Sequence, residues 1–255
     1  QLFAELDRYT AEHPQENLIV SPSWGNGTDV TARFFFPSTP PFQMGSIEGY
    51  FNEKQPLDDN TLFVMLPSEY EDMLESGKFT RVSIEKSIPY PNGEPGFLFV
   101  RLAYIDQIDE VLDTERASRR VLREADVPVG SEIWRVKYST LDLGKIEDAF
   151  DDDPESLLRT MEANPLVVEI DFPTPKTIHT VQVKVGGPPA VVDLYFTDET
   201  GAVIPYTRTV VETSAPKTVE FQLDSEIRAV RLRVEVNSVR DQEPAHVHLW
   251  EIGIE

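Results

Sequence analysis

Apolar residues in the second half of the chain recur at every other position, which is the period of a β-strand with one buried face. This alternation runs through 181–185, 192–196, 219–223 and 230–236. The strands arrive at the short spacing that is typical of sandwiches and are separated by turn residues. The pattern predicts an all-β sandwich over 128–255.

The first half mixes helical and strand patterns. Leu2, Phe3, Leu6 and Tyr9 are spaced as on one face of a helix that ends before Pro14. We therefore expect an opening amphipathic helix that packs on a sheet. Short apolar runs bounded by turn residues predict strands over 17–22, 31–36, 61–66, 79–84 and 96–105.

A second helix is expected directly after the strand 61–66. Pro67 and Ser68 form a helix start in which Ser68 is the expected cap, and Gly77 ends the helix. A third helix is expected over 107–126, where apolar residues recur among charged ones.

These elements predict an α+β multidomain chain. A small α/β sandwich domain is expected in 1–106, a linker helix in 107–127 and the β-sandwich in 128–255.

Composition excludes several classes of function. The 255 residues include 45 acidic and 23 basic side chains, so the formal net charge of −22 disfavours nucleic acid and anionic membrane surfaces as partners. There is no cysteine, which excludes disulfides and thiol catalysis. No apolar run has the length of a membrane span. Because the sequence begins without methionine or a leader, we expect a mature or excised fragment.

The loop from Asp151 to Ser156 is the candidate metal site. Asp151, Asp152 and Asp153 precede Pro154 and are followed by the hydroxyl of Ser156, so oxygen ligands gather on a loop. Three adjacent carboxylates repel one another unless a cation compensates them, which favours calcium. A solvated acidic loop without metal is the alternative.

The order of residues in 150–160, followed by a strand, resembles the start of discoidin-like (F5/8 type C, galactose-binding-like) jelly rolls. The resemblance implies a structural calcium ion and a last strand that brings its carboxylate beside the loop. It differs from the family at Asp152, where glycine is usual, and at Leu158, where tryptophan is usual. The metal ligands that the resemblance implies are Asp151, Asp153, Ser156 and Glu251.

Other candidates are single residues. His246 and His248 would share one face of a strand, but no third ligand is close in sequence, so a structural role is favoured. Trp134 and Trp250 are candidate sugar platforms or core residues, and core is the preferred interpretation. Trp24, in a glycine-rich loop, is the candidate ligand-binding residue.

The chain as a whole resembles the extracytoplasmic C-terminal region of bacterial polytopic membrane glycosyltransferases of the protein-mannosyltransferase type. The resemblance is carried by the segments 62–79 (LFVMLPSEYEDMLESGKF) and 90–104 (YPNGEPGFLFVRLAY), followed by the linker helix and the sandwich. It implies a non-catalytic accessory region that binds glycan or acceptor and is tethered through a preceding transmembrane region. Catalytic acids would lie in that membrane part.

Two other functions remain open. One is a free-standing secreted carbohydrate-binding or adhesion protein. The other is a glycoside hydrolase, because 45 acidic residues provide many carboxylate pairs. Neither a nucleophile elbow nor a phosphate-binding glycine loop is present, and no catalytic residue is assigned.

Overall fold

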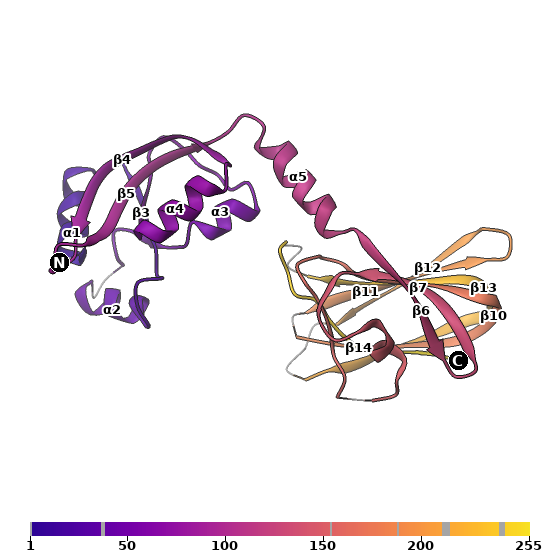
Figure 1. The fold of residues 1–255 in the computed structure, drawn as a ribbon. Helices are drawn as coiled ribbons and strands as arrows, with labels where there is room; N and C mark the ends of the chain where they lie inside the picture. The colour runs from indigo at the N-terminus through magenta and orange to yellow at the C-terminus, as the bar shows by residue number, and fades with distance from the viewer. Residues whose placement is uncertain (1, 37–38, 154, 188, 211–214, 240–242) are drawn as a thin grey trace. The chain divides into compact units, whose positions relative to one another are not determined.

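The structure is a computed structural model, and the chain in it divides into two compact units, Gln1–Asp113 and Thr114–Glu255 (Figure 1). The first unit is a small α/β domain and the second is a β-sandwich, as the sequence predicted. The described residues are 2–36, 39–153, 155–187, 189–210, 215–239 and 243–255.

A mixed sheet with the strand order β2-β1-β3-β5-β4 forms the centre of the first unit. Strand β1 pairs in parallel with β2 and β3, whereas β5 pairs antiparallel with β3 and β4. The strands are β1 (Asn17–Val20), β2 (Gln43–Met44), β3 (Thr61–Met65), β4 (Phe79–Pro89) and β5 (Pro95–Tyr104). The helices are α1 (Leu2–Glu12), α2 (Thr28–Phe35), α3 (Glu48–Asn52), α4 (Pro67–Glu75) and α5 (Ile108–Arg119), of which α5 continues into the second unit.

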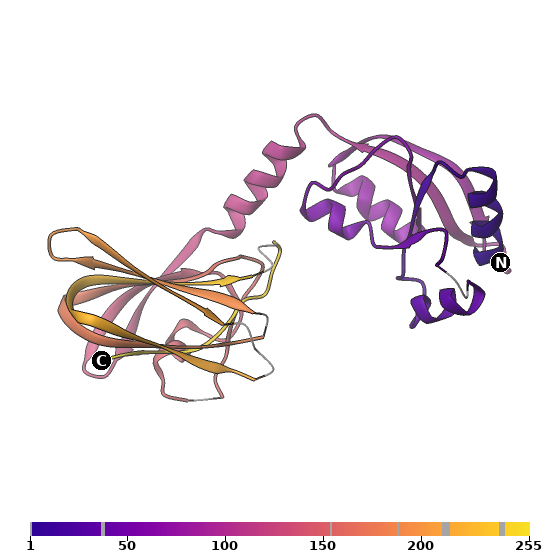
Figure 2. The same cartoon turned by 180° about the vertical axis from the view of Figure 1, so that it is seen from behind.

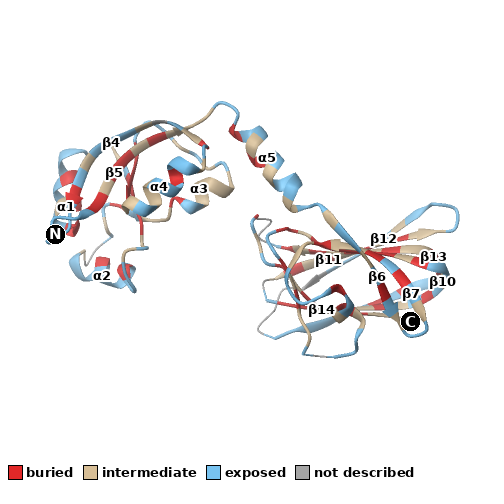
Figure 3. Cartoon of the chain, viewed as in Figure 1, coloured by how far each residue is buried: buried red, intermediate tan, exposed pale blue. Residues whose placement is uncertain are grey.

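Both faces of this sheet are covered, so β3 is buried throughout and β1 is buried from Leu18 to Val20. Leu18 and Val20 pack with Leu6 of α1 on one face. Ile19 packs with Met73 of α4 on the other face. Figure 3 shows the resulting buried residues along β3 and β5 between the helices. Buried strands of this kind read as continuous apolar runs, which is why 61–66 was recognisable.

The strand predicted over 31–36 is wrong, because these residues belong to helix α2. The helix follows Gly27, whose φ of 69° is left-handed, and it buries Thr28 and Ala32, one turn apart. Phe34 and Phe35 are exposed instead of alternating into a core. The strand preference of consecutive phenylalanines misled the prediction, since such preferences are set by tertiary context.

The start of α4 also differs from the prediction. Leu66, not Ser68, occupies the N-cap, and Pro67 is the first helical residue. The carboxylate of Glu69 accepts a hydrogen bond from the Leu66 amide at 2.8 Å and one from the Ser21 hydroxyl at 2.6 Å. The exposed donor at the helix start is thus satisfied by a side chain from inside the helix.

The helix expected over 107–126 ends at Arg119. Residues Leu122–Val129 form strand β6, which pairs antiparallel with β7 (Glu132–Ser139). Val127 of β6 is fully buried in the sandwich core, so tertiary packing outweighs the helical pattern at this point.

The sandwich of the second unit is a sheet that folds over itself. Its strand order is β12-β11-β13-β10-β14-β9-β8, with β7 paired to β10 and β6 to β7 (Figure 2). Its remaining elements are the 3-10 helix η1 (Ile146–Phe150) and the strands β8 (Leu141–Leu143), β9 (Leu158–Thr160), β10 (Leu166–Gly186), β11 (Ala190–Asp198), β12 (Val203–Val210), β13 (Lys217–Ser238) and β14 (His248–Ile254).

Two long strands, β10 and β13, belong to both layers of the sandwich. The first part of β10 pairs with β7, and its second part pairs with β14. Register shifts between Asp171 and Lys176 and between Ile178 and Thr180 mark the bend. The alternating apolar residues face inward between the layers, for example Val181, Val183, Val192, Leu194, Phe221, Leu232 and Val234.

Among the residues that the structure describes, no helix is both long and apolar enough to cross a membrane.

Candidate functional site

The acidic loop follows η1 and folds back on itself. The Ser156 hydroxyl lies 3.0 and 3.1 Å from the two carboxylate oxygens of Asp151. The Asp153 carboxylate accepts a hydrogen bond from the Glu155 amide at 3.0 Å. Asp152 has a φ of 59°, which suits the glycine that is usual in the discoidin-like pattern. The loop therefore brings the side chains of Asp151 and Ser156 together, whereas the Asp153 carboxylate binds the backbone of the loop at Glu155.

Glu251 of β14 lies close to this loop. Burial raises its pKa to about 7, and the negative charges of Asp151 and Asp152 add to the rise. A hydrogen bond from the Asp152 backbone acts in the opposite direction. The Oε2 atom of Glu251 is buried and has no hydrogen-bond partner among the described residues. This carboxylate is thus held in a site that disfavours its negative charge.

The residue types around the acidic loop are those that bind a hard cation. Asp151, Asp152 and Glu251 supply carboxylate oxygens, and Ser156 supplies a hydroxyl. A bound cation would satisfy the orphaned Glu251 oxygen and compensate the charges. No group of three histidine or acidic side chains is gathered closely enough to hold a metal within the described ranges. Asp152 was not predicted as a candidate ligand, because the family pattern has glycine at its position.

Two hollows of about 520 and 300 Å³ adjoin this region, and Asp152 and Glu251 line both of them. Trp134 lines the larger one but is only 3% exposed and belongs to the core. Its indole N–H donates to Glu132 at 2.9 Å, and the Lys176 ammonium lies 5.1 Å from its ring centre. Trp134 is therefore a core residue, as the sequence analysis preferred.

A second cluster lies on the outer face of β8, β9 and β14, and we call it the β14 platform. Arg159 binds the carboxylate of Asp142 through two nitrogens at 2.9 and 2.8 Å. Hydrogen bonds from Arg159 lower the pKa of Asp142, and the positive charge adds to this effect. This bidentate pair fixes a planar charged group on the sheet surface. The platform consists of Asp142, Arg159, His246, His248 and Trp250.

The two histidines do not share one strand as predicted, because β14 begins at His248 and His246 precedes it, but both lie near Asp142. His246 Nδ1 is 2.9 Å from the Thr160 carbonyl oxygen and 3.7 Å from the Asp142 carboxylate. Burial lowers the pKa of His248, and the positive charge of Arg159 lowers it further. The Nδ1 atom of His248 is buried without a hydrogen-bond partner in the described part of the chain.

Trp250 differs from Trp134. It is partly exposed and lies outside the core cluster, whereas its neighbour Leu249 is fully buried. Its ring centre is 6.0 Å from that of His248. A Cβ atom added to Gly186 would lie only 2.9 Å from the Trp250 ring, so the indole rests on bare glycine backbone. The prediction that Trp250 is a core residue is therefore wrong.

Trp24 packs at the edge of the first unit's core. Its ring meets Phe3 and Phe97 edge-on, with ring centres 5.8 and 5.9 Å away. Its indole N–H is buried without an acceptor among the described residues. A ligand that accepts this N–H would have to enter the aromatic cluster.

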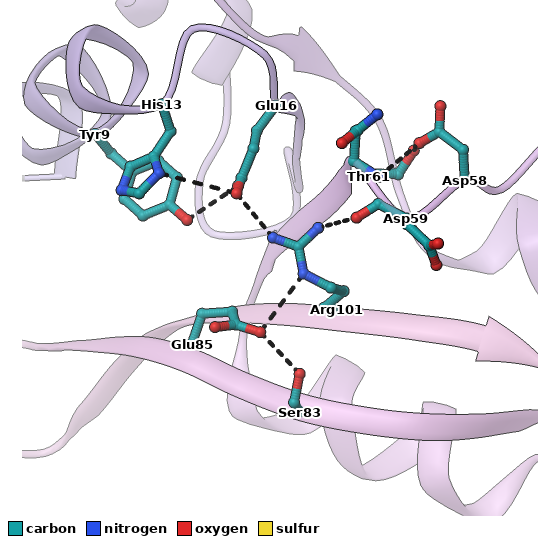
Figure 4. Close-up of polar contacts among 10 residues, drawn as sticks. Tyr9, His13, Glu16, Asp58, Asp59, Thr61, Ser83, Glu85 and Arg101 are labelled. Carbon is teal, nitrogen blue, oxygen red and sulfur yellow. Dashed lines mark hydrogen bonds and ion pairs between the residues drawn. The ribbon is translucent and has the colours of Figure 1, made fainter.

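The most connected polar cluster of the first unit surrounds Arg101 (Figure 4). Its guanidinium binds Glu16 at 2.9 Å and Glu85 at 3.5 Å, and it donates to the Asp59 carbonyl oxygen. Tyr9 donates to Glu16 at 3.0 Å, and burial together with this carboxylate raises the pKa of Tyr9 to about 12. Because one guanidinium binds both carboxylates and a backbone carbonyl group, this cluster stabilises the fold.

Comparison with known proteins gives structural similarity only. No family model and no curated protein matches the sequence. A Ruminococcus gnavus GH29 fucosidase in complex with fucose shares 15% identity over 48% of this chain, with a TM-score of 0.40, and the chain spans 25% of that protein. The family 32 carbohydrate-binding module of C. perfringens NanJ, in complex with galactose, shares 14% identity over 48% of this chain and 92% of its own, with a TM-score of 0.39.

A fucose-binding module from Streptococcus pneumoniae shares 14% identity over 51% of this chain and 97% of its own, with a TM-score of 0.37. The chain is thus similar to carbohydrate-binding modules. At these identities and TM-scores the similarity by itself carries no conclusion about a ligand.

Proposed function

We propose that the chain is a non-catalytic, glycan-binding region of a larger protein and that it binds sugar at the β14 platform. The observation that carries the proposal is the partly exposed Trp250, whose ring centre lies 6.0 Å from that of His248, the residue that pairs with Arg159 between β14 and β9. A sugar ring has an apolar C–H face that stacks on an aromatic side chain, and its hydroxyl groups pair with planar charged groups.

The platform also fits a sugar in its rigidity. Arg159 and Asp142 hold each other, and the Trp250 indole contacts the His248 ring and the backbone at Gly186. A platform fixed in this way loses little side-chain entropy on binding. Its residues are exposed or partly exposed, which suits weak binding of glycan chains, with a dissociation constant of about 1 mM, or roughly 4 kcal/mol.

A glycan array followed by titration of tryptophan fluorescence tests the proposal. The array carries oligosaccharides that end in galactose, fucose, mannose or glucose. Trp250→Ala should abolish binding of the glycans that the native chain retains, whereas Trp24→Phe should leave it unchanged. Binding that survives Trp250→Ala and is lost in Trp24→Phe would move the site to the first unit.

The acidic loop is proposed to hold a structural calcium ion through Asp151, Asp153, Ser156 and Glu251, with Asp152 as an additional ligand. The orphaned oxygen and raised pKa of Glu251 support a cation at this place. Calcium would bind the loop to β14 and thereby stabilise the sandwich. Melting curves with calcium and with chelator test this role.

The parent protein is proposed to be a polytopic membrane glycosyltransferase of the protein-mannosyltransferase type, with this region outside the cytoplasm and tethered through preceding membrane spans. The sequence resemblance over 62–79 and 90–104 supports this parent. Sequencing the gene upstream of residue 1 tests it. About eight or more apolar segments of about 20 residues are expected, whereas a single leader peptide would indicate a secreted binding protein.

A further inference from the structure

A third surface of the second unit brings several arginine side chains together. A hollow of about 570 Å³ opens beside the end of α5, the strand β6 and the outer face of β13. Its polar lining comprises Arg116, Arg120, Arg233, Glu235, Asn237 and Glu243. We call this hollow the arginine groove.

The lining of the groove has a formal excess of one positive charge, although the chain carries a net charge of −22. Three arginines and two glutamates line it. Two further arginines, Arg119 and Arg123, lie in the same short segment of sequence. Of 23 basic residues in the whole chain, this segment of eight positions from 116 to 123 contains four. Such a concentration favours an anionic ligand.

Glu243 organises one wall of the groove. Its side chain is only 3% exposed and binds Arg120 at 2.7 Å and Arg119 at 3.4 Å. It also accepts a hydrogen bond from the Asn164 amide at 2.9 Å. A buried carboxylate with these partners holds both guanidinium groups in place, as a supporting residue does beneath a binding site.

Arg233 is fixed on β13. Its Nε donates to Glu235 at 2.6 Å, and a terminal nitrogen donates to Glu169 at 3.3 Å. Asn237, two positions further along β13, donates to Asp193 at 3.1 Å. The groove therefore has preorganised polar groups on more than one element.

These contacts do not use all of the N–H donors of Arg120 and Arg233. A guanidinium group has five N–H donors. Within the described residues, the contacts of Arg120 with Glu243 use its Nε, and those of Arg233 use its Nε and one terminal nitrogen. Terminal N–H groups of both arginines therefore remain for a ligand acceptor, and a carboxylate matches their planar fork geometry.

We propose that the arginine groove binds the carboxylate of an acidic sugar residue, such as a uronic or sialic acid, at a site separate from the β14 platform. The volume of the groove suits a mono- or disaccharide. Its lining also includes Leu122 and Val167, against which a sugar ring can pack, while Asn237 provides a partner for a sugar hydroxyl group. A purely inorganic anion would use only the arginines.

Titration calorimetry on the whole chain tests the proposal. Binding of digalacturonate is compared with that of neutral galactobiose, and binding of 3′-sialyllactose with that of neutral lactose. At least one acidic sugar should bind at least tenfold more tightly than its neutral partner. Arg120→Gln should weaken this binding about tenfold, the effect of one charge-assisted hydrogen bond.

Arg123→Gln is the matched control, because it removes the same charge from the same segment but contacts Thr140 outside the groove. It should change the affinity less than twofold. Asn237→Ala provides a second groove variant that leaves both arginines in place, and it should weaken the acidic sugars. Trp250→Ala should leave binding of the acidic sugars intact, which separates this site from the β14 platform.

Equal binding of acidic and neutral sugars, or no binding of either acidic sugar, would overturn the proposal. Equal losses in Arg120→Gln and Arg123→Gln would also overturn it, because they would indicate unspecific attraction. Inorganic phosphate that binds as tightly as the acidic sugars would assign the groove to a free oxyanion instead.

Discussion

Substitution of Glu251 by glutamine removes one negative charge where the fold disfavours it. In the metal-free protein, burial and the neighbouring Asp151 and Asp152 raise the pKa of Glu251 from 4.5 to about 7. The folded state therefore holds a proton that the unfolded state releases between these pH values. Stability falls as the pH rises from about 4.5 through about 7, and the loss is complete above pH 7.

The size of the effect follows from this pKa. A change from 4.5 to about 7 corresponds to roughly 3 kcal/mol. Because Glu251 is partly exposed, solvent screening reduces this to about 1 kcal/mol. Glu251→Gln should thus stabilise the metal-free protein by about 1 kcal/mol at pH 8 and by almost nothing at pH 4.

Calcium should make the native chain more stable than the Glu251→Gln variant, the reverse of the order expected without metal. At ten times its dissociation constant, calcium should stabilise the native chain by about 1.4 kcal/mol at pH 8, because it binds the folded state only. The Glu251→Gln variant lacks the carboxylate ligand and should gain much less. Glu155→Gln is the matched control, since it removes an exposed carboxylate of the same loop and should behave like the native chain in both conditions.

Urea unfolding at pH 4 and pH 8, in chelator and in calcium, measures all of these quantities. If Glu251→Gln is no more stable than the native chain at pH 8 in chelator, the assigned environment of Glu251 is wrong. If calcium stabilises both proteins equally, Glu251 is not a ligand. An unchanged stability of the native chain in calcium would refute the calcium site itself.

Two further predictions concern the first unit and the platform. Arg101→Ala leaves the carboxylates of Glu16 and Glu85 without their shared cation and should lower the free energy of unfolding in urea by about 2 kcal/mol. Arg33→Ala is the control, because its pair with Asp29 is exposed, and it should lower this free energy by less than about 0.5 kcal/mol. Equal losses in the two variants would contradict the structural role of the Arg101 cluster. Gly186→Val places a side chain against the Trp250 ring and should weaken glycan binding at least tenfold with little loss of secondary structure. Gly253→Ala is the control, because there is room for the added methyl group, and it should leave glycan binding unchanged. Fluorescence titration measures the binding, and circular dichroism measures the secondary structure of both variants.

The sequence predicted the elements whose pattern has a direct physical cause. The period of two in 181–185 and 230–236 reports one buried face, and the structure places Val181, Val183, Val185, Leu232, Val234 and Val236 in the sandwich core. Val230 is only partly buried, because the pairing of β13 with β10 shifts register there and Ala229 is buried instead. The opening helix buries the four apolar residues that its spacing indicated. Helix α2 was missed because its signal was a left-handed Gly27 and two small buried residues, and the three phenylalanines outweighed both.

The candidate sites were predictable only in part. The acidic loop stands out in sequence because its carboxylates are adjacent, and Glu251 joined it through a family resemblance. The β14 platform joins residues from three strands, so Asp142 and Arg159 carry no sequence signal that links them to Trp250. The four arginines of 116–123 are visible in the sequence, but their meaning depends on Glu243, more than a hundred positions away, and on β13.

The central claim is that the β14 platform binds glycan, and fluorescence titration of the native chain beside Trp250→Ala tests it most directly. The account predicts saturable changes in tryptophan fluorescence with a glycan identified on the array, at about millimolar concentration or below, and no saturable binding by Trp250→Ala in calorimetry. Equal calorimetric affinities of the two proteins for that glycan would contradict the account.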